Sequence, residues 1–113
     1  MIPYGHQHID EGDIGEVVQV LRSDWITQGS KVAEFEKALA DYCGAKYAVA
    51  ASSGTAALHA SFVASGLKSG DEFITTPITF PATSNSGMWQ GAKPVFIDTE
   101  IETGNIDTSL IEN

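Results

Sequence analysis

Residues 52–58 (SSGTAAL) have the composition and position of an anion-binding turn. They follow a predicted strand and open a predicted helix, so the free N–H groups of the first helical turn and the positive end of the helix dipole point at one spot. Gly54 lacks the side chain that would obstruct an anion, and Ser53 and Thr55 add hydroxyl donors. Ser and Thr also cap ordinary helices, so this segment alone leaves both interpretations open. It matches neither the dinucleotide glycine motif nor the P-loop.

A second candidate segment spans residues 75–85 (TTPITFPATSN). Pro77 ends a predicted strand at the carboxyl edge of the sheet, where open α/β sheets bind their ligands. An aromatic side chain such as Phe80 at that edge can stack on a planar ring. The alternative is that Phe80 simply packs in the core, and the segment alone favours that alternative.

Other reactive side chains are weaker candidates. His6 and His8 lie among acidic residues in a segment without periodicity, which is typical of surface residues, and we predict no metal site. Trp25 stands outside any apolar stripe, in a predicted loop at residues 23–29 (SDWITQG), and either lines a ligand or partner surface or folds back on its own domain. Cys43 ends an apolar helix face and is predicted to be a small buried hydrophobe.

Two helices are predicted to precede these segments. Asp10 caps the first, and Ser30 caps a second that stops at Gly44. Apolar residues at helical spacing predict a buried stripe on each helix. These stripes are Ile14, Val17, Val18 and Leu21 on the first, and Val32, Phe35, Leu39 and Tyr42 on the second.

The rest of the chain alternates strands with helices. Strands are predicted at residues 46–51, 72–76 and 94–98, and helices at 54–65 and 80–90, although Gly87 weakens the second helix; Asp107 is predicted to cap another. This order predicts an α/β fold with a mainly parallel sheet. We expect residues 1–45 to form an N-terminal segment with two helices, and residues 46–113 to form the first part of a larger, incomplete α/β domain.

Composition limits the class of partner. Fifteen acidic residues against six basic ones give a formal charge of −9, which argues against binding to nucleic acid or an anionic membrane. A single cysteine permits no internal disulfide, and the polar start has no signal-peptide pattern. We therefore expect a cytoplasmic protein.

Taken together, four segments resemble the DegT/DnrJ/EryC family of sugar-nucleotide aminotransferases. They are WITQG (25–29), FEKALADYCGAKYAVAASSGTAALHAS (35–61), GDEFITTPITFPATSN (70–85) and GAKPVFIDTE (91–100). The family's order and approximate spacing are kept across nearly the whole chain. The run TPITFPAT and the ending GNIDTSLIE (104–112) are most similar to the members that act in pseudaminic acid biosynthesis.

The resemblance implies the N-terminal part of the large domain of a fold type I transferase, a three-layer α/β structure that uses pyridoxal phosphate (PLP). It implies that Ser53, Gly54 and Thr55 hold the cofactor phosphate and that Phe80 stacks on its pyridine ring. It also implies contacts to a UDP-sugar, with glutamate as the amino donor, in a homodimer whose sites lie at the subunit interface. The residues implied in those sugar contacts are Tyr4, Ser23, Asp24, Trp25 and Ile26.

The chemistry needs a lysine that binds the cofactor and an acid beside its pyridine nitrogen. In the family both lie downstream of the matched region, and none of the chain's five lysines matches the family's lysine motif. We therefore assign no catalytic residue and expect the isolated chain to be inactive. Two alternatives remain: a sugar dehydratase of the same fold, in which histidine replaces the lysine, and a binding or assembly module without chemistry.

Overall fold

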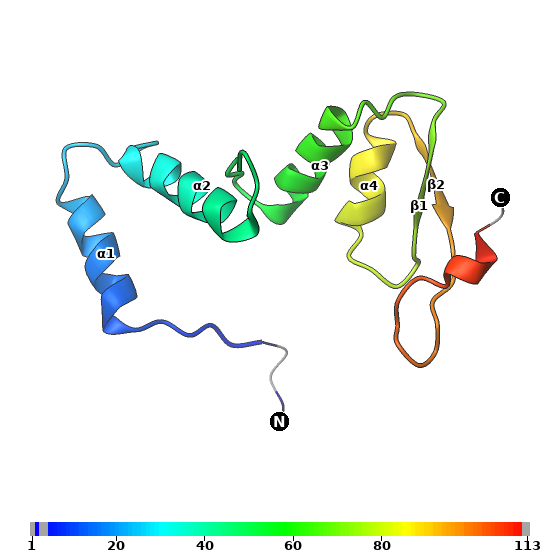
Figure 1. The fold of residues 1–113 in the computed structure, drawn as a ribbon, viewed down its shortest axis with the longest axis horizontal. Helices are drawn as coiled ribbons and strands as arrows, with labels where there is room; N and C mark the ends of the chain where they lie inside the picture. Colours follow the sequence, from blue (N-terminus) through cyan, green and yellow to red (C-terminus); the bar gives the residue numbers. More distant parts are fainter. Residues whose placement is uncertain (1, 3–4, 112–113) are drawn as a thin grey trace. The chain divides into compact units, whose positions relative to one another are not determined.

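The computed structural model describes residue 2 and residues 5–111, and the chain divides into two compact units, Met1–Ala50 and Ala51–Asn113. Figure 1 shows the helices and strands of the two units. The boundary predicted after residue 45 stays a prediction. Within the described residues, none of the helices is long and apolar enough to cross a bilayer.

The first unit contains helices α1 (Glu11–Leu21) and α2 (Ser30–Cys43). Asp10 caps α1 as predicted: its Oδ1 accepts hydrogen bonds from the N–H groups of Gly12 at 2.8 Å and Asp13 at 3.1 Å. The carboxylate of Asp13 completes the capping box by accepting from the Asp10 N–H at 3.0 Å. Gly44 ends α2 in the left-handed conformation at φ 64°, also as predicted. The predicted cap at Ser30 is wrong by one residue, because Gly29 is the N-cap and makes no side-chain bond.

The apolar stripes of these two helices are not buried, contrary to the prediction. Phe35 is 57% exposed and Val17 59% exposed, and Ala40 is the one described residue of α1 and α2 that is buried. Within the described residues of the first unit, no other element covers these apolar faces. Cys43 is exposed for the same reason, so its predicted burial is also wrong.

The second unit contains α3 (Gly54–Ala64), β1 (Glu72–Thr75), α4 (Ala82–Met88), β2 (Lys93–Phe96) and the 3₁₀ helix η1 (Thr108–Leu110). Strands β1 and β2 pair in parallel, with Glu72 beside Lys93 and Thr75 beside Phe96. This confirms the α/β class and the parallel crossover through α4. Asp107 caps η1 by accepting from the Ser109 N–H at 2.9 Å, so the predicted cap is confirmed although the turn is 3₁₀.

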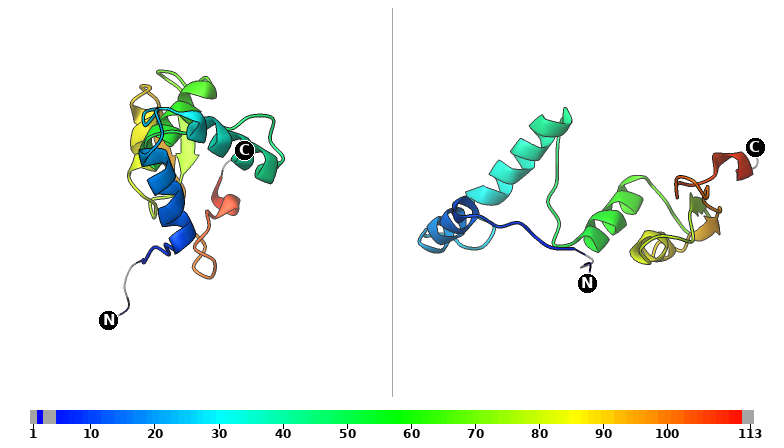
Figure 2. Two further views of the ribbon diagram at one scale, coloured as in Figure 1. Left: turned by 90° about the vertical axis from the view of Figure 1, so that its left-hand side faces the viewer. Right: turned by 90° about the horizontal axis from the view of Figure 1, so that it is seen from below.

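The packing of this unit is one-sided. Helix α4 lies between α3 and the strands, while η1 lies on the other side of the strand pair (Figures 1 and 2). The ring of Phe73 in β1 packs on Phe62 of α3, with ring centroids 5.0 Å apart. It also lies against Gly87 of α4, which is buried. The helical layer that would cover the second face of the sheet is absent from the described residues.

The strand predicted at residues 46–51 does not form. The segment has no regular structure, and Tyr47 and Val49 are 75% and 85% exposed. The segment has the composition of a strand, but a strand also requires a neighbouring strand as its hydrogen-bonding partner. The two strands of the described sheet, β1 and β2, pair only with each other. The segment is held to α2 by one bond, from the Ala50 N–H to Oε1 of Glu36 at 2.8 Å.

Candidate functional site

The N-terminal turn of α3 has the geometry of an anion site. Ser53 is extended, at φ −163°, and its Oγ accepts from the Ala56 N–H at 3.1 Å. Its carbonyl oxygen accepts from the Ala57 N–H at 3.0 Å. As the first two residues of the helix, Gly54 and Thr55 therefore present N–H groups that have no intrahelical acceptor.

The space in front of this turn is open. A Cβ built on Gly54 would meet no heavy atom within 4 Å, and Gly54 itself is exposed. Thr55, the second residue of the helix, is half-buried. Two unpaired amides, two hydroxyls and the positive end of an 11-residue helix together suit a phosphate dianion.

Phe80 lies in the segment between β1 and α4 and is 72% exposed. The alternative of a core phenylalanine is therefore wrong for this chain. The segment is shaped by local hydrogen bonds: Thr76 Oγ1 donates to the Ile78 carbonyl at 3.2 Å, and the hydroxyls of Thr79 and Thr83 lie 3.3 Å apart. The flat face of the ring is free to stack on a planar group. Phe80 belongs to the same unit as the α3 turn.

The loop at residues 23–29 belongs to the other unit and forms its own hollow. Ser23 Oγ donates to the Val20 carbonyl at 2.7 Å and so closes the end of α1. A Cβ on Gly29 would lie 2.9 Å from the Trp25 carbonyl oxygen, so glycine is needed for the chain to return beside the indole residue. The resulting cavity of about 260 Å³ is lined in part by Ser23, Trp25 and Ile26.

Two further residues are predicted to contact the sugar, Asp24 and Tyr4. Asp24 is exposed and is not among the residues that line the cavity. Tyr4 lies outside the described residues. Of the described residues predicted to form the site, Ser53, Gly54, Thr55 and Phe80 belong to the second unit, whereas Ser23, Asp24, Trp25 and Ile26 belong to the first.

The side chains of four lysines make defined contacts, and none of these contacts is of the kind that activates a lysine as a nucleophile. Lys31 bonds to Glu16 at 3.1 Å and to Glu34 at 2.9 Å, and these hydrogen bonds, from Glu34 first, raise its pKa above the ordinary 10.5. A nucleophilic lysine needs the opposite shift. Lys37 and Lys93 form ion pairs with Asp41 and Glu72, and Lys46 lies 5.2 Å from the ring centre of Tyr47.

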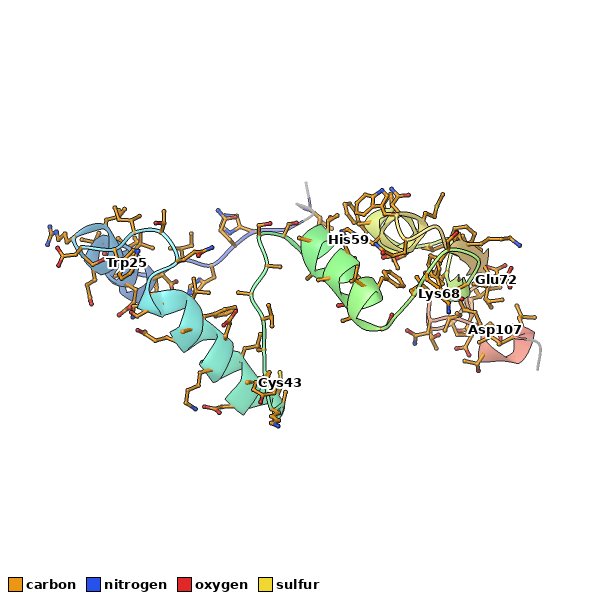
Figure 3. The ribbon with its side chains drawn as sticks, turned by 90° about the horizontal axis from the view of Figure 1, so that it is seen from above. Trp25, Cys43, His59, Lys68, Glu72 and Asp107 are labelled. Carbon is orange, nitrogen blue, oxygen red and sulfur yellow. The ribbon has the colours of Figure 1, made fainter. Side chains whose placement is uncertain are left out.

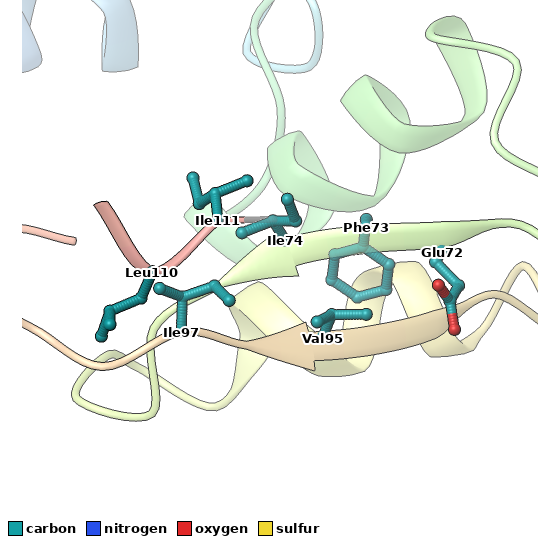
Figure 4. Close-up of a pocket in the computed structure, with 7 residues that line it drawn as sticks. All are labelled: Glu72, Phe73, Ile74, Val95, Ile97, Leu110 and Ile111. Carbon is teal, nitrogen blue, oxygen red and sulfur yellow. The ribbon is translucent and has the colours of Figure 1, made fainter. Parts of the chain in front are cut away.

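Another hollow, of about 720 Å³, lies in the second unit (Figure 4). It occupies the sheet face beside η1 and is lined by Ile74, Val95, Ile97, Leu110 and Ile111 together with Glu72 and Phe73. Parallel sheets are normally covered on both faces, so an apolar face with nothing packed on it is expected where the covering layer is missing. We therefore interpret it as exposed core rather than as the ligand site. No cluster of three or more metal-binding side chains occurs in the described part of the chain.

Sequence reasoning missed a polar pair between α3 and α4. Nε2 of His59 lies 2.6 Å from Nε2 of Gln90, and the His59 ring meets Trp89 edge-on at 5.3 Å. His59 is labelled in Figure 3 beside the neighbouring helix. The available signal was a histidine four residues after Thr55, hence on the same face of the helix. Ser86, whose buried hydroxyl has no partner among the described residues, gave no such signal.

The sequence of this chain is similar to those of known aminotransferases. The DegT/DnrJ/EryC1/StrS aminotransferase family matches residues 7–113. The UDP-4-amino-4,6-dideoxy-N-acetyl-beta-L-altrosamine transaminase of Campylobacter jejuni is 45% identical over 112 residues, which are 99% of this chain and 29% of that protein. The chain therefore spans under a third of the length of the relatives it matches.

Solved structures of sugar aminotransferases also match this chain. PseC of Helicobacter pylori, an aminotransferase involved in the biosynthesis of pseudoaminic acid, is 37% identical with a TM-score of 0.87, over 97% of this chain and 31% of that one. Spr1654 of Streptococcus pneumoniae, assigned as a sugar aminotransferase and solved in PLP and PMP forms, is 37% identical with a TM-score of 0.88, over 96% of this chain and 28% of that one.

These matches confirm the resemblance inferred from the four sequence segments, and with it the fold. They also confirm the cofactor class, because the aminotransferases of this family use pyridoxal phosphate. The start of α3 fits the phosphate of that cofactor on its own geometry, through its open glycine and its unpaired amides. The chain belongs to the DegT/DnrJ/EryC1/StrS family of PLP-dependent aminotransferases.

Proposed function

We propose that this chain is the N-terminal portion of an aminotransferase that moves an amino group from glutamate to the 4-keto carbon of a UDP-linked 4-keto-6-deoxy-N-acetylhexosamine. The family match over residues 7–113 and the 45% identity to the altrosamine transaminase support the substrate class. The unpaired amides at the start of α3 are the structural observation that supports the cofactor site.

In this proposal the residues of the second unit bind the cofactor. The amides of Gly54 and Thr55, with the hydroxyls of Ser53 and Thr55, bind the phosphate, and the helix dipole adds to the attraction. Phe80 stacks on the pyridine ring, and its 72% exposure leaves a face for that contact. When bound, pyridoxal phosphate supplies the electron sink for transamination.

The first unit contributes to sugar recognition in this proposal. The hollow lined by Ser23, Trp25 and Ile26 offers an aromatic face and hydrogen-bonding groups of the kind that suit a nucleotide-sugar. Asp24 and Tyr4 are proposed as further contacts from the family resemblance alone. A homodimer, with sites at the subunit interface, and a cytoplasmic location stay predictions.

The chain's own lysines carry no catalytic role in this proposal, because none of the five matches the family's lysine motif; three of them, Lys31, Lys37 and Lys93, are also engaged in ion pairs. We therefore propose that the reactive lysine lies outside residues 1–113 and that the isolated chain is inactive. A histidine in its place would make the complete protein a sugar dehydratase instead.

Visible spectroscopy tests the proposal. The complete gene product that contains this chain, mixed with pyridoxal phosphate, should show the absorption band of lysine-bound cofactor, and borohydride should remove it. Residues 1–113 alone should show no such band. A complete protein without the band would contradict the transaminase assignment, and a band in the isolated chain would contradict the statement that the lysine lies outside it.

A further inference from the structure

Helix α3 is held to the end of α4 by one polar contact. Nε2 of His59 and Nε2 of Gln90 lie 2.6 Å apart, and because the Gln90 amide nitrogen can only donate, the His59 ring nitrogen is the acceptor of this hydrogen bond. The pair is partly buried, and Trp89 covers the His59 ring edge-on at an interplanar angle of 76°. A partly buried hydrogen bond constrains the relative orientation of the two side chains as well as their distance, whereas apolar packing does not constrain orientation as closely.

The same face of α3 carries the predicted phosphate-binding threonine. Thr55, Leu58, His59 and Phe62 follow helical spacing and are all half-buried, whereas Ala57, Ala60 and Ser61 are exposed. Phe62 packs on Phe73 at the far end of this face. Thr55 lies one turn, about 5.4 Å, before His59, so a rotation or slide of α3 at His59 moves Thr55 by a similar amount.

We propose that His59 and Gln90 are positioning residues that fix the phosphate-binding turn of α3. This inference rests on the proposed cofactor site and adds residues that do not touch the cofactor. Phe62 and Phe73 hold the helix against the sheet, while the His59–Gln90 bond sets the rotation of the helix about its axis. Binding groups must be held within about 0.5 Å of their productive geometry, so a loosely held α3 should bind phosphate less tightly.

The test compares two cofactor forms that differ only in the phosphate. The complete gene product is titrated by calorimetry with pyridoxamine phosphate and with pyridoxamine. His59→Leu and Gln90→Leu should each weaken pyridoxamine phosphate binding about 3- to 10-fold, as for one lost hydrogen bond, and leave pyridoxamine binding unchanged. The double variant should be no weaker than either single one, because both remove the same bond.

Three controls make the outcome specific. His59→Gln keeps a side chain able to bond to Gln90 and should restore most of the affinity. Ser61→Ala changes the exposed face of α3 and should bind like the unchanged protein. Thr55→Val removes a proposed phosphate ligand and should weaken pyridoxamine phosphate binding alone.

Each contrary result has a distinct meaning. If Thr55→Val weakens phosphate-dependent binding but both leucine variants do not, the positioning role is wrong and the cofactor site stands. If the leucine variants weaken both ligands equally, or if their effects add, the pair is merely structural and the inference is overturned. If the unchanged protein binds pyridoxamine phosphate no more tightly than pyridoxamine, the proposed cofactor site fails, and the inference fails with it.

Discussion

Gly87 of α4 lies directly on the ring of Phe73 in β1, so closely that a Cβ at Gly87 would be 2.5 Å from Cζ of the ring. Real side chains do not approach to that distance, so the helix can cover this strand only with glycine at position 87. The contact brings α4, and with it the segment that carries Phe80, against the sheet.

Replacement of Gly87 by alanine should lower the free energy of unfolding by about 1–3 kcal/mol, because the added methyl forces the ring or the helix to shift. Urea unfolding of the complete gene product measures the change. Gly15→Ala is the matched control: it also lies within a helix, has nothing within 4 Å of its Cβ position, and should be neutral or stabilising by up to about 1 kcal/mol. Equal stability of the two variants would contradict the close contact.

The same glycine illustrates what sequence could and could not predict. Local signals were sufficient for the capping by Asp10, the stop at Gly44 and the parallel strands β1 and β2, since each depends on nearby residues or on strand–helix alternation. Gly87 looked like a weakness in a helix, because its reason lies in a strand residue 14 positions earlier. One cause explains both the missing strand at residues 46–51 and the exposed apolar stripes of α1 and α2. Amino-acid composition shows which residues favour strand pairing or burial, but not whether another segment of the chain pairs with them or packs on them.

Some features of the candidate site could likewise be predicted from the sequence, and others could not. The anion-binding turn was predictable, because strand, glycine and helix start are contiguous in the sequence. The His59–Gln90 pair was not, because its members are 31 residues apart and meet only through the packing of α3 on α4.

Phe80 and Thr55 should affect cofactor binding differently. Phe80→Ala removes ring stacking and should weaken pyridoxamine and pyridoxamine phosphate equally, by about 3- to 10-fold. Thr55→Val should weaken only the phosphate form. Calorimetric titration of the complete gene product separates the two, and Ile78→Ala, an exposed change in the same segment, is the control. A phosphate-selective loss in Phe80→Ala would contradict the stacking role.

The first unit should depend on pH through Lys31, which joins Glu16 of α1 to Glu34 of α2. The hydrogen bond from Lys31 lowers the pKa of Glu34 below its ordinary 4.5, so its stabilising effect is present above pH 4.5 and is lost as the pH falls through the lowered value. The raised pKa of Lys31 means that its contribution is present below pH 10.5 and is lost as the pH rises further.

Lys31→Gln should therefore lower the urea midpoint of unfolding at pH 7 and have a smaller effect near pH 3, where more of Glu34 is protonated. High salt should also reduce the difference, because the charges are exposed. Lys37→Gln is the control, since Lys37 pairs with Asp41 within α2 alone and does not join the two helices. A Lys31→Gln effect that is the same at pH 3 and pH 7 would show that packing, not charge, is responsible.

The isolated 113-residue chain should associate in solution. The apolar stripes of α1 and α2 and the sheet face around Ile74, which is 49% exposed, leave apolar surface in contact with water. Light scattering should detect oligomers or aggregates whose size grows with concentration, and Phe35→Glu should reduce them. A monodisperse monomer that melts in one sharp transition would be inconsistent with this description.

The central claim is that the free amides at the start of α3 bind the cofactor phosphate. Hydrogen–deuterium exchange of the complete gene product, with and without pyridoxal phosphate, reports on those amides directly. We predict that exchange slows on cofactor addition in the peptide that contains Gly54 and Thr55, and stays unchanged in the exposed turn at residues 100–104. Unchanged exchange at Gly54 and Thr55 in a protein that has bound the cofactor would contradict the claim.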